Sequence, residues 1–322
     1  MMKTNRIILA GGSGFLGGVL SKWFVARGHE VIVLTRSPRE GRTVATEVGW
    51  DGKTLGCWTQ LVEGAQAVIN LTGRSVNCRY HERNRREIME SRVHATRVVG
   101  EAIARSKLPP AVWLNASTAT IYKHSLDKNM DEDGVIGATP EAKDAFSVEV
   151  AIAWEAEFNN APAPHTRKVA LRSAMVLGTD RNSVLPNLQR LARFGLGGTM
   201  ASGKQYMSWI HEEDYCRAIQ WILDHDQLEG PVNVTAPNPL PNLEFMRIVR
   251  KVCRAPVGVP NPLWLLEFGA FLIRTETELV IKSRRAVPAK LLQSGFEFRF
   301  PDLEPAVREI HERSRHPNNR PL

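Results

Sequence analysis

A glycine-rich segment near the N-terminus has the spacing of a nucleotide-binding loop. Gly11, Gly14 and Gly17 follow the apolar run Arg6–Ala10 and open a helical pattern. Glycine permits the tight turn at Gly11, lets a pyrophosphate approach the backbone at Gly14, and allows close packing of the helix on the strand at Gly17. The unpaired N–H groups at the start of the helix then bind the pyrophosphate. The sequence therefore predicts a dinucleotide-binding loop made of Gly11, Gly14, Phe15, Leu16 and Gly17.

The end of the next apolar run contains the residues that would choose between the two nicotinamide dinucleotides. An NAD site places Asp or Glu here, whose carboxylate accepts hydrogen bonds from the ribose 2′-OH. Residues 31–39 contain no acidic side chain and include Thr35, Arg36 and Ser37. The Arg36 guanidinium is suited to a charge-assisted fork on a 2′-phosphate, with Ser37 as a second donor. The sequence therefore predicts NADP(H); the alternative is that Arg36 only stacks on the adenine.

The first half of the chain alternates short apolar runs with helical patterns, as a series of βαβ units does. Strands are predicted at residues 6–10, 31–35, 66–71, 111–116 and 168–172, and helices at 15–27, 83–105 and 141–160. Continuous apolar runs such as residues 31–34 are typical of strands that are covered on both faces. The predicted fold class is therefore α/β, a Rossmann fold with a doubly wound parallel sheet.

The composition of the sequence changes after residue 177, where prolines and glycines become frequent and the predicted elements become shorter. Such residues punctuate loops and short elements. We therefore expect an NADP-binding Rossmann domain over residues 1–177, which takes back part of 205–235. A smaller C-terminal mixed α/β substrate region is expected over residues 178–322.

The charge of the chain indicates an anionic partner. The 322 residues have a formal net charge of +8, and residues 79–107 supply half of that excess with eight Lys/Arg against four Asp/Glu. Arg79, Arg83 and Arg86 fall on one helical face, either as a solvated face or as a clamp for an anion beside the cofactor. Nucleic acid is not expected, because aromatic residues make up 7% and no nucleic-acid-binding signature accompanies the arginines.

Cysteines and apolar runs indicate the compartment. The four cysteines are far apart and form no CxxC pair, which predicts neither a disulfide framework nor a metal site and favours a reducing, cytoplasmic location. The most apolar stretch, residues 263–273, is interrupted by Glu267 and is too short to span a bilayer. We therefore expect no membrane partner.

Short motifs spread over nearly the whole chain accompany the glycine loop. In chain order they are NLTG at 70–73, ESRV at 90–93, ASTATIY at 116–122, WE at 154–155, LRS at 171–173, FGLGG at 194–198, SWIH at 208–211, GPVN at 230–233 and GF at 295–296. Together they resemble the extended short-chain dehydrogenase/reductase superfamily. Within it the chain is most similar to the atypical epimerase-like family, also described as NAD-dependent epimerase/dehydratase or nucleoside-diphosphate-sugar epimerase-like.

The resemblance implies roles for individual positions. It implies cofactor contacts at Asn70, Leu71, Thr72, Gly73, Arg92, Ala116, Ser117, Arg172 and Met175. Thr118 takes the place of the superfamily's catalytic Ser/Thr, whose hydroxyl hydrogen-bonds the substrate oxygen. Trp209 and His211 resemble the segment that closes the substrate cleft. A homodimer through the predicted helices at 83–105 and 141–160 is also implied.

The catalytic pair is where the chain departs from the superfamily. Its members generally place Tyr-x-x-x-Lys on the helix after Thr118, where the tyrosine passes the proton and the lysine lowers its pKa. By alignment, this chain has Phe146 and Val150 at the two positions, an absence common in the narrower family. Three groups could carry the proton instead: Tyr122, Glu149 and His211. Their plainer interpretations are a packing residue, an exposed helix carboxylate and a helix-start residue.

The function implied is an NADP(H)-dependent, epimerase-like oxidoreductase. Hydride would pass between the nicotinamide and a carbonyl or alcohol carbon of a small molecule, polarised by Thr118. Two alternatives remain: a non-catalytic NADP(H)-binding redox sensor or scaffold, which the missing pair favours, and a nucleotide-sugar epimerase.

Overall fold

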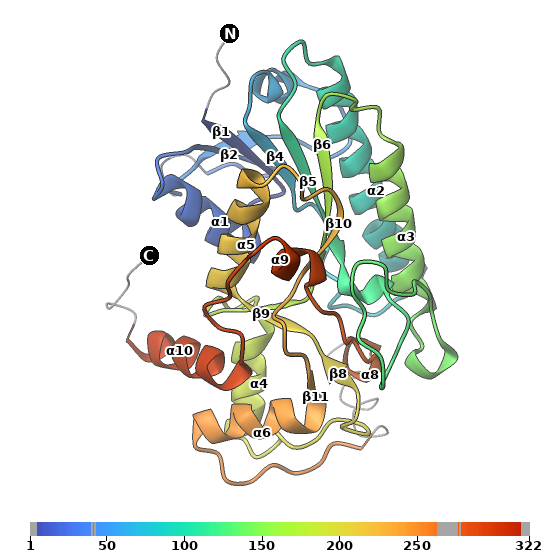
Figure 1. The fold of residues 1–322 in the computed structure, drawn as a ribbon, viewed down its shortest axis with the longest axis vertical. Helices are drawn as coiled ribbons and strands as arrows, with labels where there is room; N and C mark the ends of the chain where they lie inside the picture. Colours follow the sequence, from blue (N-terminus) through green and yellow to red (C-terminus); the bar gives the residue numbers. More distant parts are fainter. Residues whose placement is uncertain (1–4, 40, 42, 263–275, 277, 317–322) are drawn as a thin grey trace.

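A seven-stranded, all-parallel sheet forms the centre of the first half of the chain (Figure 1). The structure is a computed structural model, and it describes residues 5–39, 41, 43–262, 276 and 278–316. The strands lie in the order β10 (Gly230–Val234), β6 (Arg167–Ser173), β5 (Val112–Thr118), β4 (Ala67–Asn70), β1 (Arg6–Ala10), β2 (Glu30–Thr35) and β3 (Thr46–Gly49). The order reverses between β1 and β4, as it does in a doubly wound Rossmann sheet. The predicted fold class is confirmed.

Helices cover both faces of this sheet. On one face lie α1 (Phe15–Val25) and α5 (Glu212–Asp224), which pack on Ile7 and Leu9 of β1. The other face packs Ile8 and Ala10 against α2 (Glu82–Arg105), with α3 (Ala145–Asn160) beside it. Successive strand residues point to opposite faces, so burial on both sides explains why these strands are continuously apolar.

The predicted strands and helices of the first half are all present, with shifted ends. Helix α3 begins at Ala145 and not at Glu141, because Pro140–Ala142 form a short 3₁₀ turn (η3) and Lys143 has a φ of 53°. The sequence analysis did not predict β3, an edge strand of only four residues. Two further 3₁₀ turns are η1 (Cys57–Val62) and η2 (Ala119–Ile121).

The C-terminal half has a core of its own, formed mainly by α4 (Val184–Arg193), α6 (Asn242–Cys253) and α10 (Leu303–Arg315). Two small sheets pair β7 (Met175–Leu177) with β9 (Trp209–His211) and β8 (Tyr206–Met207) with β11 (Leu240–Pro241). Helices α8 (Glu278–Ile281) and α9 (Ala289–Gln293) follow. The chain returns to the Rossmann sheet through α5 and β10, which pairs with β6.

The described residues hold neither a membrane-spanning helix nor a metal cluster. No helix found there is both long and apolar enough to cross a bilayer. The same residues contain no cluster of three or more His, Cys, Asp or Glu side chains placed to hold a metal ion. The apolar stretch at 263–273 lies outside the described residues.

Candidate functional site

The predicted cofactor residues lie along a single edge of the sheet. Five neighbouring strands, β2, β1, β4, β5 and β6, end there and carry residues 35–37, 11–17, 70–73, 116–118 and 172–175. Main-chain bonds join the loops: Gly11 N–H donates to the Leu34 carbonyl at 2.9 Å, and Leu71 N–H to the Ala10 carbonyl at 2.8 Å. Ligands of doubly wound folds bind at this carboxyl edge, where the strand order reverses.

The glycine loop leaves room where a phosphate would lie. Gly14 is the N-cap of α1, no side chain caps the helix, and a Cβ at Gly14 would meet no atom within 4 Å. A Cβ at Gly17, by contrast, would overlap the main chain of Gly12. Gly11 has a φ of 71°, which favours glycine. The free N–H groups at the start of α1 therefore face open space and can bind an anion.

Thr72 provides a test of whether a dinucleotide fits this loop. Its Oγ1 is buried and has no hydrogen-bond partner in the part of the chain that the structure describes. A Cβ at Gly11 would lie 2.6 Å from that oxygen, so the hydroxyl borders the glycine loop. An unsatisfied buried hydroxyl costs about 1–3 kcal/mol, and a phosphate or ribose oxygen would satisfy it. The residues present fit the predicted cofactor.

A buried polar network holds the 70–73 turn. Asn70 accepts a hydrogen bond from Thr72 N–H at 3.1 Å and donates to Asn115 Oδ1 at 2.7 Å. Thr96 Oγ1 lies 3.3 Å from both asparagine side chains and accepts from Trp154 Nε1 at 2.9 Å. These side chains are buried, so Asn70 shapes the cofactor edge from beneath.

Arg92 supports the same turn. Its guanidinium stands over the Trp154 ring, 5.1 Å from the centroid, and donates to the Ile88 carbonyl at 2.9 Å. A Cβ at Gly73 would lie 3.1 Å from Arg92 Cζ. Burial lowers the pKa of Arg92 to about 10. The close approach of Gly73 explains why a glycine stands there.

The residues after β2 differ in whether they are paired. Arg36 and Ser37 are exposed, and no hydrogen bond or ion pair of the Arg36 side chain is recorded within the described ranges. Ser37 N–H donates to Thr35 Oγ1 at 3.4 Å. Arg39 binds Glu47 of β3 through its N–H at 2.7 Å and its guanidinium at 3.2 Å. Arg36 is therefore free to meet a 2′-phosphate, whereas Arg39 is engaged.

Ser117 and Arg172 have structural partners inside the protein, and their contact with the cofactor stays a prediction. Arg172, 4% exposed, forms a bidentate pair with Glu155 at 2.9 and 2.8 Å. Ser117 Oγ donates to the same carboxylate at 2.5 Å. The polar ends of both side chains are used inside the protein.

The surroundings of the three suggested substitutes for the missing tyrosine are known, while their role as proton carriers stays a prediction. Tyr122 is buried; its hydroxyl donates to Asn233 Oδ1 at 2.7 Å and accepts from Arg172 at 2.9 Å. Burial raises the pKa of Tyr122 to about 12. His211 is 1% exposed, accepts from Glu213 N–H at 3.0 Å and contacts Glu309 at 2.8 Å. Glu149 is exposed on α3. Their plainer interpretations fit the structure.

Other predicted residues occupy simpler positions. Phe15, Leu16 and Leu71 are half-buried against the sheet core, the Ala116 carbonyl accepts from Asn115 at 3.0 Å, and Met175 begins β7. Trp209 is fully buried, and its likeness to the segment that closes the substrate cleft stays a prediction. The predicted arginine clamp is partly neutralised: Arg79 pairs with Glu276 at 3.6 Å and Arg83 with Glu87 at 2.8 Å.

Thr118, at the end of β5, donates no hydrogen bond from its hydroxyl to the described residues. Its Oγ1 accepts from Thr120 N–H at 3.1 Å, and the side chain is only half-buried. A hydroxyl that accepts from the main chain still has its O–H to donate. The arrangement suits the role of hydrogen-bonding a substrate oxygen.

An apolar cluster fills the position of the missing tyrosine. Phe146 and Val150 pack with Ile88, and the Tyr80 ring stands edge-on to Phe146 at 5.1 Å. Ser147 hydrogen-bonds the carboxylate of Glu278. The pKa of Glu278 is raised by burial.

The sequence did not predict that Tyr80 and Glu278 lie beside Phe146 and Ser147 of α3. Both residues come from segments far from α3 in the chain. No local pattern brings either to this position.

Comparison with known proteins identifies the family. The model of the NAD dependent epimerase/dehydratase family matches residues 7–235, more than half of the chain. The chain belongs to this family. A second model, a domain of unknown function (DUF1731), matches residues 262–310.

Relatives of this epimerase/dehydratase chain cover nearly its whole length. The epimerase family protein YfhF of Bacillus subtilis is 33% identical over 95% of this chain and 97% of its own. The human epimerase family protein SDR39U1 (isoform 2), solved with NADPH, has a TM-score of 0.82 and 28% identity, covering 95% of this chain and 99% of that chain. A nucleoside-diphosphate sugar epimerase from Corynebacterium glutamicum has a TM-score of 0.74 and 26% identity, covering 95% of this chain and 57% of that chain.

Proposed function

We propose that this chain is an NADP(H)-dependent oxidoreductase of the extended short-chain dehydrogenase/reductase type. One observation supports the choice of NADP(H) as the cofactor. Arg36 is exposed beyond the glycine loop and unpaired within the described residues, and residues 31–39 include no acidic side chain. The solved human relative that holds NADPH supports the same choice. Residues at the five strand ends would bind the dinucleotide.

The chemistry follows from what each group can do. The bound cofactor supplies or accepts a hydride. The N–H groups at the start of α1 bind the pyrophosphate of the cofactor. The Thr72 hydroxyl donates a hydrogen bond to a ribose or phosphate oxygen. Thr118 donates its O–H to the substrate oxygen and so polarises the carbonyl carbon. Positioning of this kind lowers the barrier even where a general acid contributes little.

The substrate is proposed to be a small carbonyl or alcohol compound bearing negative charge. The net charge of +8 on the chain supports a substrate of negative charge. The homodimer through α2 and α3 and the cytoplasmic location stay predictions. So does the division of the chain at residue 177.

A redox sensor is a second candidate, and Phe146 favours it. The ring fills the position of the proton-passing tyrosine and packs among apolar side chains, so the usual acid–base step has no group there. A sensor would bind NADP(H) as tightly as an enzyme and turn over nothing.

The cofactor assignment is tested by Arg36→Asp. A guanidinium about 4 Å from a phosphate contributes about 1–4 kcal/mol at effective dielectric constants between 80 and 20, or about fivefold to several hundredfold in Kd. We expect that loss for NADPH and little change for NADH in fluorescence titrations. Arg39→Asp in the same loop is the control, since Arg39 is already paired with Glu47. Equal losses for both dinucleotides would contradict the assignment.

Turnover separates the enzyme from the sensor. NADPH absorbance is followed with a panel of aldehydes, ketones and nucleotide sugars, using the wild type and Thr118→Val. Oxidation that depends on Thr118 supports the enzyme. Tight NADPH binding with no oxidation by any compound favours the sensor.

A further inference from the structure

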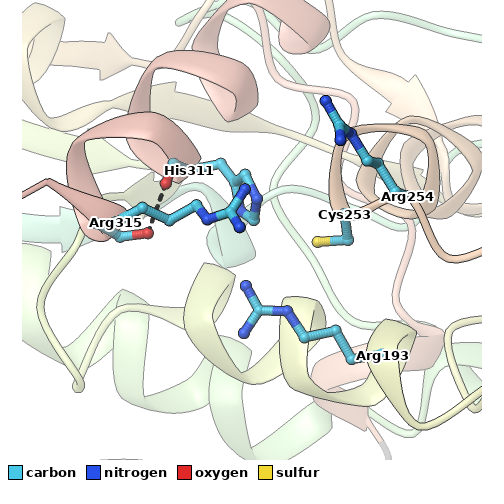
Figure 2. A pocket seen from close by; sticks show the side chains of 6 residues that line it. Arg193, Cys253, Arg254, His311 and Arg315 are labelled. Atoms are coloured by element: carbon cyan, nitrogen blue, oxygen red, sulfur yellow. Dashed lines mark hydrogen bonds between the residues drawn. The ribbon is translucent and has the colours of Figure 1, made fainter.

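Three helices of the C-terminal half end around a polar pocket far in sequence from the glycine loop. The pocket has a volume of about 490 Å³ and is lined by Arg193, Cys253, Arg254, His311, Ser314 and Arg315. Figure 2 shows the Arg193 guanidinium and the Cys253 sulfur turned toward the space between the helices, with Arg315 beside His311. The lining therefore has three permanent positive charges and no acidic residue.

Pairing distinguishes these arginines from their neighbours. Basic side chains at the ends of the same helices but off the pocket have partners: Arg190 with Asn187 at 3.2 Å, Arg250 with the Gly197 carbonyl at 2.7 Å, Lys251 with Glu304 at 2.8 Å and Arg313 with Glu309 at 3.0 Å. No ion pair or hydrogen bond of the Arg193, Arg254 or Arg315 guanidinium is recorded in the described part of the chain. At these three helix ends, the described cations without a recorded partner are therefore the ones that line the cavity.

Helix dipoles explain only part of this arrangement. A cation in the last turn of a helix is stabilised by about 0.3–1 kcal/mol, and α4 and α10 each have one at the pocket. That effect does not require the cations of three helices to share a cavity. Like charges held together repel. Burial lowers the pKa of His311, and the field of the nearby arginines lowers it further. A bound anion would relieve the repulsion.

Arg254 also occupies a backbone conformation that favours glycine. It follows the last residue of α6 with a φ of 53°, where helices commonly place glycine. A side chain there costs about 1–2 kcal/mol. Arg254 thus lines the pocket in spite of a backbone cost.

We propose that this pocket binds a small molecule bearing a phosphate or diphosphate group, held by Arg193, Arg254 and Arg315. Guanidinium groups match phosphate oxygens with paired, charge-assisted hydrogen bonds. The volume lies within the range of small-molecule sites, about 300–1,000 Å³. The pocket shares no residue with the glycine loop, and α4, α6 and α10 lie below β1 and β2 in Figure 1. It is a second anion site, independent of the proposed function.

Cys253 allows a local test on the full-length chain. Its thiol is half-buried in the pocket, whereas Cys57 is exposed and lies outside it. Alkylation by iodoacetamide is followed for each cysteine by peptide mass spectrometry, with inorganic pyrophosphate as the probe. At ten times its dissociation constant, pyrophosphate should slow alkylation of Cys253 about tenfold and leave Cys57 unchanged. Because the readout is confined to Cys253, pyrophosphate bound at the glycine loop does not register.

Controls decide between specific binding and general screening. Sodium chloride at matched ionic strength should give little protection. The double variant Arg193→Gln/Arg315→Gln should need at least about tenfold more pyrophosphate for the same protection, whereas Arg190→Gln, on α4 but off the pocket, should match the wild type. The proposal is overturned if pyrophosphate leaves the Cys253 rate unchanged, if chloride protects equally, or if the double variant is protected like the wild type. The protection of Cys253 in the wild type still tests the proposal if the double variant fails to fold.

Discussion

Replacing Arg172 tests whether that residue serves the fold or the nicotinamide. Its guanidinium binds Glu155 twice, the Tyr122 hydroxyl at 2.9 Å and the Glu132 carbonyl at 3.0 Å. Arg172→Ala would leave the Glu155 carboxylate buried with the Ser117 hydroxyl as its remaining recorded partner among the described residues. We expect the free energy of unfolding to fall substantially, with no selective loss of cofactor affinity.

The magnitude follows from the burial of the pair. The side chains of Arg172 and Glu155 are 5% and 10% exposed, so neither charge is well solvated once its partner is removed. Breaking a buried pair of this kind costs about 3–5 kcal/mol. Total stabilities are only about 5–15 kcal/mol, so the variant should unfold at a much lower urea concentration. Arg83→Ala, which removes an exposed i,i+4 pair, should cost about 0.5 kcal/mol or less.

Urea unfolding followed by tryptophan fluorescence measures the difference, with circular dichroism as the check on the native state. The double variant Glu155→Leu/Arg172→Met should cost less than the sum of the two single variants, because the charges depend on each other. The reasoning is refuted if Arg172→Ala unfolds at the wild-type urea concentration. A variant of wild-type stability that binds NADPH poorly would restore the nicotinamide role.

Two more variants test the loop and the buried tyrosine. Gly17→Ala should lower the free energy of unfolding by about 1–3 kcal/mol, since its Cβ overlaps Gly12, while Gly18→Ala has open space; thermal melts compare the two. Burial raises the pKa of Tyr122 from 10.0 to about 12, so stability is lost as pH rises through that interval. In Tyr122→Phe, the melting temperature should fall less steeply between pH 9 and 12 than it does in the wild type. A fall as steep as that of the wild type would contradict the raised pKa of Tyr122.

The sheet and the glycine loop could be predicted because their signals are local. An apolar strand run needs only its own residues, and Gly11, Gly14 and Gly17 lie within one turn and one helix start. Strand β3 was not predicted because its four residues are exposed or half-buried at the sheet edge and make no apolar run. The start of α3 was misplaced because the left-handed Lys143 has no sequence signature.

The polar side chains were harder because their partners lie far along the chain. Tyr122 binds Asn233, 111 residues away, and His211 binds Glu309, 98 residues away. The residue type shows which hydrogen bonds a side chain can form. The fold decides whether the side chain forms them with other residues of the protein or with a ligand. Arg36 differs, since an exposed residue beside a recognisable loop needs no distant partner.

Side chains of the C-terminal half hold the turn that follows β5. Lys282 donates to the Thr120 carbonyl at 2.5 Å and pairs with Asp144, which directly precedes α3. Arg284 donates to Thr120 Oγ1 at 2.9 Å, and Thr120 N–H in turn binds Thr118. Buried charges that lose their partners are costly, so the turn that presents the Thr118 hydroxyl depends on residues more than 150 positions later. The turn that carries the Thr118 hydroxyl is therefore held by residues from both halves of the chain.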